Sequence, residues 1–126
     1  MTTGRDRYLA ERVSTASPEQ LIMMLLDRAV AELQLAQQDL TNGDRLAAAP
    51  HLRRAQDIVG ELRCSLDLTV GDIATHLDEL YRFAYRELVE AGLDGEATRV
   101  AGVVAILEPL RSGWSEACCN AVPTQL

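Results

Sequence analysis

The chain has 126 residues, of which 48% are hydrophobic and 25% are charged. A chain of this size can bury about two-thirds of the surface that its unfolded form exposes, so one domain can fold on apolar packing without a metal or a disulfide. The formal net charge is −7, and arginine is the basic residue at every basic position. This balance argues against binding to the phosphate backbone of nucleic acid.

The pattern of apolar residues argues against membrane insertion and secretion. The longest uninterrupted apolar run, residues 21–26, is far shorter than the roughly 20 residues of a membrane-spanning helix. The polar residues 1–6 lack the apolar region of a signal peptide. Cys64, Cys118 and Cys119 form no Cys-x-x-Cys pair and have no neighbouring histidine, which suits a reducing compartment. We expect a cytoplasmic protein without a metal or another cofactor.

The first predicted helix begins after Ser17, which can cap it, and ends at residues 41–43. Pro18 suits the first helical position, and Gln20 can complete a capping box with Ser17. Apolar residues then recur at alternate spacings of four and three, which predicts one buried stripe along about six turns. The stripe consists of Ile22, Leu26, Ala29, Leu33, Ala36 and Leu40.

The second predicted helix is capped by Asp44 and contains Pro50. An interior proline loses a hydrogen bond and clashes with the preceding turn, so we expect a kink or a late start there. The apolar stripe of this helix consists of Ala55, Ile58, Val59, Leu62 and Leu66.

The third predicted helix follows a turn at residues 69–71, and Gly92 is placed to end it. Its polar face carries Asp78, Arg82 and Arg86. The helical period predicts that its other face is buried. That face consists of Ile73, Leu77, Leu80, Tyr81, Ala84 and Leu88.

The fourth predicted helix can be capped by Asp94, whereas Pro109 and Gly113 weaken its last turns. Its stripe consists of Val100, Val103, Val104, Leu107, Leu110 and Trp114. Short connections between long helices predict an all-α, antiparallel up-down four-helix bundle over residues 17–118. An apolar N-terminal leader, residues 1–16, should pack on this bundle, and residues 119–126 should form a flexible tail.

A metal site is weakly indicated by Asp72, His76 and Glu79, whose spacing places them on one helix face. Carboxylate-bridged metal bundles draw ligands from all four helices, and this chain has no second helix of that kind. We therefore interpret the three residues as a solvated polar face.

A histidine phosphotransfer domain is the alternative function. His51 is followed by Arg53 and Arg54, which could steady a phosphoryl group on the ring. Pro50 immediately before His51 would distort the helix that has to present the ring. No serine or cysteine nucleophile has a candidate base beside it, so we expect no enzyme.

Apolar residues beyond the main stripes leave two interpretations open. In the third helix these are Phe83 and Tyr85, beside Tyr81. In the first helix they are Leu21, Met23, Met24 and Leu25. These side chains either thicken the core against the leader or form an interaction groove. Periodicity alone does not decide between the two.

Several short motifs, taken together in order, resemble the FliS family of flagellin export chaperones. The opening combines a tyrosine, a Thr-Ala-Ser-Pro cap and a Met-Leu-x-Asp run, and weaker matches continue to residue 118. The matching residues include Tyr8, Val13, residues 15–18, Met24, Leu25, Asp27, residues 42–44, 55–58, 65–67 and 71–74, Leu77, Leu80, Tyr81 and Trp114. Leu26 and Arg28 stand where the family has a tyrosine and a glycine, and Pro50 and Pro109 interrupt segments that the family keeps helical.

The resemblance implies a flagellar secretion chaperone in the cytoplasm. Such a protein binds the disordered C-terminal segment of flagellin in apolar grooves, prevents its premature polymerisation and supports its export. A client of this kind folds as it binds. The resemblance leaves open an export-gate component or a co-chaperone as a further partner.

On this interpretation the flagellin-binding groove lies mainly between the second and third helices. We expect apolar residues to line it and a polar edge to border it, although some of the aliphatic members suit the core equally well. Two leader residues, Tyr8 and Val13, would dock the leader on the bundle. The expected groove residues are Gln56, Asp57, Ile58, Val59, Leu62, Leu66, Ile73, Leu77, Tyr81 and Tyr85.

Overall fold

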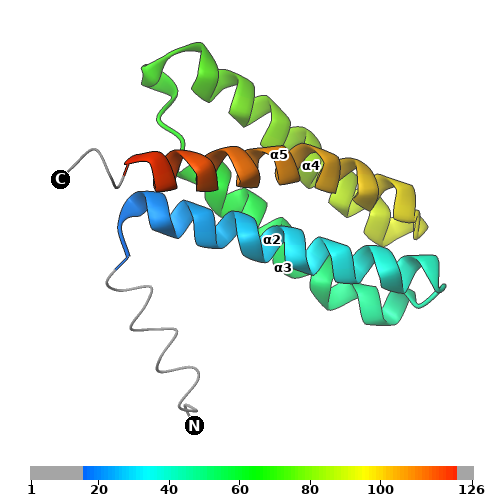
Figure 1. The fold of residues 1–126 in the computed structure, drawn as a ribbon. Coiled ribbons are helices and arrows are strands. Elements are labelled where there is room, and N and C mark those ends of the chain that lie inside the picture. The colour runs from blue at the N-terminus through cyan, green and yellow to red at the C-terminus, as the bar shows by residue number, and fades with distance from the viewer. Residues whose placement is uncertain (1–15, 122–126) are drawn as a thin grey trace, which may run out of the picture.

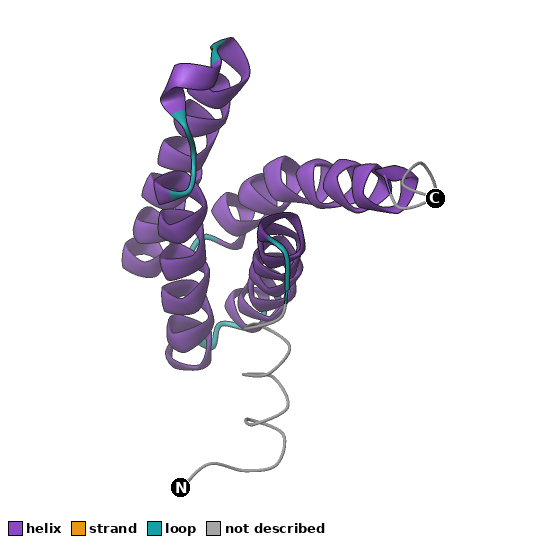
Figure 2. Cartoon of the chain, turned by 90° about the vertical axis from the view of Figure 1, so that its left-hand side faces the viewer, coloured by secondary structure: helices purple, strands orange, loops and turns teal. Residues whose placement is uncertain are grey.

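The computed structural model describes the backbone of residues 16–121 and the side chains of residues 16–115. Its four long helices are α2 (Pro18–Thr41), α3 (Arg45–Cys64), α4 (Asp72–Asp94) and α5 (Ala97–Ala121), and a short 3-10 helix, η1 (Leu68–Val70), precedes α4. Successive long helices run in opposite directions (Figure 1). The described residues form only helices and loops (Figure 2). The predicted all-α, antiparallel four-helix architecture is confirmed.

The four helices form a closed ring of neighbours around one core. Helix α2 packs against α3 and α5, and α4 completes the ring by packing against the same two helices. Each helix contributes a stripe of small and branched apolar side chains, as the helical period predicts. The largest fully buried side chains are Leu26, Leu33, Leu62, Leu88, Leu107, Val59, Val100 and Val103.

The start of α2 is held by the predicted capping box. The backbone N–H of Gln20 donates to Ser17 Oγ at 3.2 Å, and the Ser17 N–H donates to Gln20 Oε1 at 2.9 Å. Asp44 caps α3 in a similar way, because its Oδ1 accepts the N–H of Ala47 at 3.0 Å. Both caps satisfy backbone donors that have no partner inside the helix.

The two interior prolines do not shorten their helices. Helix α3 begins at Arg45, before Pro50, so of the two expected alternatives, a kink or a late start, the late start does not occur. Helix α5 continues through Pro109 to Ala121, into the range that we expected to be a flexible tail. Pro50 and Pro109 are both exposed, and so are Leu46 and Ala105, the residues four positions earlier whose carbonyls lose a partner. Water can satisfy those carbonyls, which lowers the cost of each proline.

Helix α4 ends at Asp94 with Gly95 as its C-cap residue, and not at Gly92 as predicted. Gly95 adopts a left-handed conformation with φ of +73°, which favours glycine at a helix end. Arg45 of α3 extends to this end and donates to the carbonyl oxygens of Gly92 at 3.2 Å and Leu93 at 2.6 Å. The last carbonyl groups of α4 therefore accept hydrogen bonds from a side chain of the neighbouring helix. The sequence of α4 alone does not reveal this contact.

The first turns of α4 project beyond the bundle. Ile73 was expected in the core but is 78% exposed, and Leu80 is also exposed. The ribbon shows why, because the start of α4 rises away from the end of α5 and leaves these turns without a covering helix (Figure 1). Ala74 is the one buried residue of these first turns, and the rest of the buried stripe of α4 consists of Tyr81, Ala84, Leu88 and Ala91.

The leader was expected to pack on the bundle through Tyr8 and Val13. Both residues lie outside the described part of the chain, and Ala16 is the only leader residue within it. The docking of the leader stays a prediction.

Candidate functional site

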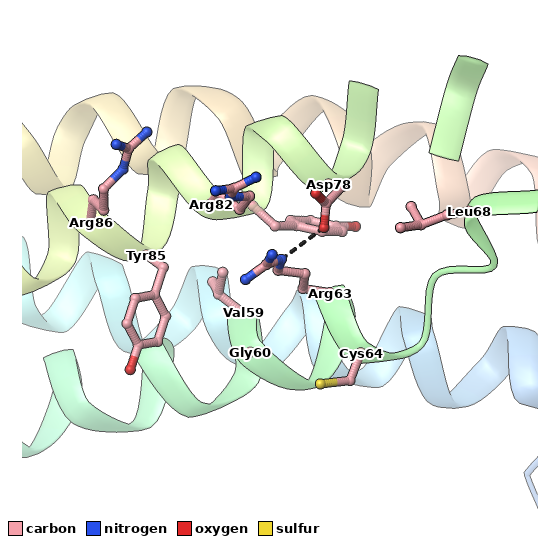
Figure 3. A pocket seen from close by; sticks show the side chains of 10 residues that line it. Val59, Gly60, Arg63, Cys64, Leu68, Asp78, Arg82, Tyr85 and Arg86 are labelled. Carbon is pink, nitrogen blue, oxygen red and sulfur yellow. Dashed lines mark hydrogen bonds and ion pairs between the residues drawn. The ribbon is translucent and has the colours of Figure 1, made fainter. Parts of the chain in front are cut away.

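A groove of about 490 Å³ lies between α3 and α4. It occupies the side of the bundle where the predicted binding site was placed, and Figure 3 shows it from close by. Its lining is Val59, Gly60, Arg63 and Cys64 of α3, Leu68 of η1, and Asp78, Tyr81, Arg82, Tyr85 and Arg86 of α4.

The floor of the groove is apolar and the α4 wall is aromatic. Val59 and Tyr81 are buried, and burial raises the pKa of the Tyr81 phenol. Tyr85 is 43% exposed and extends from α4 towards α3 (Figure 3). Gly60 contributes no side chain, and a Cβ added there would meet no atom within 4 Å apart from the neighbouring backbone of its own helix. The middle of the groove is therefore open down to the backbone of α3.

One ion pair crosses the groove near its η1 end. Arg63 Nε of α3 lies 2.7 Å from Asp78 Oδ1 of α4 (Figure 3). The aspartate is mostly buried and the arginine is half exposed. The pair links α3 to α4 next to the projecting first turns of α4. It also neutralises the charge of Arg63 within the groove.

The structure brings together only part of the predicted groove. Val59, Tyr81 and Tyr85 line it. Ile58 and Leu62 are buried in the core, and Leu66 and Leu77 pack against the core while partly exposed. The remaining three expected residues, Gln56, Asp57 and Ile73, lie outside the lining.

The sequence analysis missed the polar and small members of the lining. Asp78, Arg82 and Arg86 repeat every four residues and were assigned to a polar face of α4 without a role. These residues are close in sequence to Tyr81 and Tyr85, so the helical period places the charged and the aromatic residues on adjoining faces of α4. That pattern could have indicated that both groups line one groove. Gly60 offered a weaker signal, as a glycine inside a helix costs stability relative to alanine.

Beyond the groove, the approach to α4 is apolar and exposed. Leu68, Val70 and Ile73 are all well exposed, and Leu68 also lines the groove. Exposed apolar residues that adjoin a groove are typical of a protein interaction surface. The apolar surface therefore extends from the groove onto the projecting end of α4.

His51 is held inside a network of charged residues and is not freely displayed. Its Nδ1 lies 2.5 Å from Oε2 of Glu32, a carboxylate that is only 4% exposed, and its Nε2 lies 3.9 Å from Asp39. Arg28 also donates to Glu32 at 2.8 Å, and Arg54 lies 3.6 Å from it. A phosphoryl acceptor needs an accessible nitrogen, so this arrangement opposes the phosphotransfer alternative.

The buried Glu32 carboxylate should contribute to stability in a pH-dependent way. Burial alone would raise its pKa, but hydrogen bonds from His51 and Arg28 and their charges lower it below the ordinary value. A lowered folded-state pKa adds stability that is present above the unfolded-state pKa and is lost as pH falls through the folded-state value.

Replacing Glu32 with glutamine should therefore lower the free energy of unfolding by about 1–3 kcal/mol at pH 7, because the charge-assisted bonds are lost. The loss should shrink as the pH falls below the ordinary pKa of glutamate. Urea denaturation between pH 3 and 7 measures it, with the exposed Glu61→Gln as the matched control. If Glu32→Gln lowered the free energy of unfolding equally at pH 3 and at pH 7, the Glu32 carboxylate would not be an ionised, stabilising group.

Within residues 16–115, no three or more His, Cys, Asp or Glu side chains are grouped to hold a metal ion. Asp72, His76 and Glu79 are all exposed on α4. Across the described helices, none combines the length and the apolar character that a membrane crossing requires.

Comparisons with known proteins agree with this fold. The model of the family described as flagellar protein FliS matches residues 1–121. The flagellar secretion chaperone FliS of Salmonella typhimurium is 37% identical over 106 residues, which cover 82% of this chain and 78% of that protein. The protein of the same name from Bacillus subtilis is 28% identical over 110 residues, covering 87% of this chain and 82% of that one.

A solved structure described as a flagellar chaperone from bacteria supports the architecture independently. It superposes with a TM-score of 0.74, covers 90% of this chain and 94% of its own, and is 20% identical in sequence. At that identity the likeness speaks for the fold alone. The family model matches residues 1–121, and the two relatives match 82% and 87% of this chain, so these comparisons show the family as well as the fold. The chain therefore belongs to the FliS family of flagellar secretion chaperones.

Proposed function

We propose that this chaperone binds the C-terminal segment of flagellin in the groove between α3 and α4. The groove itself is the observation that carries the proposal, because it combines a buried apolar floor with the half-exposed ring of Tyr85. Amphipathic aromatic side chains suit interfaces in which one end is buried and the other meets a partner. The apolar surface around η1 would extend the contact.

The binding removes the apolar face of the client from water. A disordered segment that becomes helical exposes this face, and several such segments would associate with one another. A preformed groove can accept the face as the helix forms, so the client is kept from polymerising in the cytoplasm until export. The four-helix core supplies a rigid frame for this contact. Docking of the leader through Tyr8 and Val13 belongs to the same proposal.

Isothermal titration calorimetry with a peptide of the last few dozen residues of flagellin from the same organism tests the proposal. We expect binding with a clearly negative heat-capacity change, because coupled folding and binding typically bury about 1,000–3,000 Å². A peptide of equal length from another part of flagellin is the control. Absence of binding across a range of temperatures, or equal binding of the control peptide, would refute the proposal.

A further inference from the structure

We propose that Arg82 and Arg86 make the groove selective for an acidic amphipathic helix, with carboxylates four residues apart beside its apolar stripe. This inference rests on the proposed function and specifies which chemistry in the client segment is recognised. It concerns two residues of the α4 wall that lie one helical turn apart, on either side of Tyr85 in sequence (Figure 3).

The charge of the groove is opposite to the charge of the chain. The full chain carries −7, whereas the lining contains three arginines and one aspartate. That aspartate, Asp78, is already paired with Arg63. Arg82 and Arg86 form no ion pair or hydrogen bond with any residue that the structure describes, and both are exposed on α4, the helix that also carries Tyr85. The unneutralised positive charge of the groove therefore lies at these two residues.

Arg82 and Arg86 lie four residues apart on one helix, so their side chains leave α4 about one turn apart. Like charges four residues apart on a helix destabilise it by a few tenths of a kcal/mol. A docked helix rises about 1.5 Å per residue, so two carboxylates four residues apart on it would match the arginines turn for turn. Each carboxylate could then accept hydrogen bonds from a guanidinium, and the repulsion along α4 would be relieved.

The same charges would make the recognition specific. The net negative charge of the chain repels an acidic client, so the two neighbouring arginines of the groove favour one position for the docked helix. A client stripe with lysine or arginine at these positions would place like charges together, which is costly at an interface.

A charge-reversal experiment tests the inference. The variants are Arg82→Glu, Arg86→Glu and the double variant, and the control is Arg53→Glu, an exposed arginine of α3 outside the groove lining. The probes are the natural flagellin C-terminal segment and a version in which every Asp and Glu is replaced by its amide. Far-ultraviolet circular dichroism checks that each variant remains folded.

For the natural segment, we expect the double variant to raise the dissociation constant about tenfold and Arg53→Glu to leave it nearly unchanged. For the amide segment, the double variant should change the constant less than about twofold, since no carboxylate remains to be repelled. Equal losses for both segments, or no loss for the natural one, would overturn the inference. If the inference fails but a leucine placed at Gly60 still weakens the binding of the natural segment, the proposed function stands without the inference. If the natural segment does not bind the unaltered protein at all, the proposed function itself fails.

Discussion

Replacing Gly60 with leucine should weaken the binding of the flagellin segment about 10- to 100-fold without unfolding the chaperone. Gly60 lies in the interior of α3 and lines the groove, and a Cβ built on it has no atom within 4 Å apart from the neighbouring backbone of its own helix. The first atom of an added side chain therefore meets open space, and a leucine there would occupy part of the groove that the client needs. Overpacking an interface in this way costs about 1–3 kcal/mol, which corresponds to that range of affinity.

Gly60→Ala is the matched control for the blocked groove. Alanine adds one methyl group and favours the helix over glycine by about 0.5–1 kcal/mol, so this variant should be more stable and should retain most of its affinity. Calorimetry gives the affinities, and urea denaturation gives the stabilities. Unchanged client binding by a folded Gly60→Leu protein would show that the segment binds elsewhere.

The ends and faces of the helices could be predicted from the sequence where local chemistry determines them. Ser17, Pro18 and Gln20 specify the start of α2 by themselves, because all the groups of the capping box lie within four residues. The period of Leu26, Leu33 and Leu40 identifies the buried face of that helix, since a stripe of this length needs a partner surface.

Features that depend on a second helix could not be predicted in this way. The period of α4 places Ile73 on the apolar face, but it cannot reveal that no helix covers this face at the start of α4. The end of α4 depends in the same way on Arg45, which comes from another helix and satisfies the last carbonyls.

The groove shows the same limit more sharply. The apolar pattern left open whether Tyr81 and Tyr85 belong to the core or to a groove, and the family resemblance placed them in a groove between the second and third helices. Gly60, Arg82 and Arg86 join them only because α3 and α4 lie side by side with this particular rotation. The rotation of each helix about its own axis decides which of its residues face the other helix. This rotation is set by packing across the whole core, so it cannot be predicted from the sequence of either helix alone.

Replacing Leu33 with alanine should lower the free energy of unfolding by about 2–5 kcal/mol, which is a large part of the stability of a domain of this size. Leu33 is 0% exposed and lies in the middle of α2, the helix that packs against both α3 and α5. Deleting its side chain would leave a cavity at the centre of the ring. Urea denaturation followed by circular dichroism measures the loss.

Leu46→Ala provides the comparison, because Leu46 is 87% exposed and its removal should change the stability by no more than about 0.5 kcal/mol. A loss below about 1 kcal/mol for Leu33→Ala, or similar losses for the two variants, would contradict the assigned core. Leu33 lies on α2 and does not line the groove between α3 and α4. Under conditions where Leu33→Ala is folded, its affinity for the flagellin segment should therefore stay close to that of the unaltered protein. Leu33→Ala should thus lose stability and keep its affinity, whereas Gly60→Leu should stay folded and lose affinity.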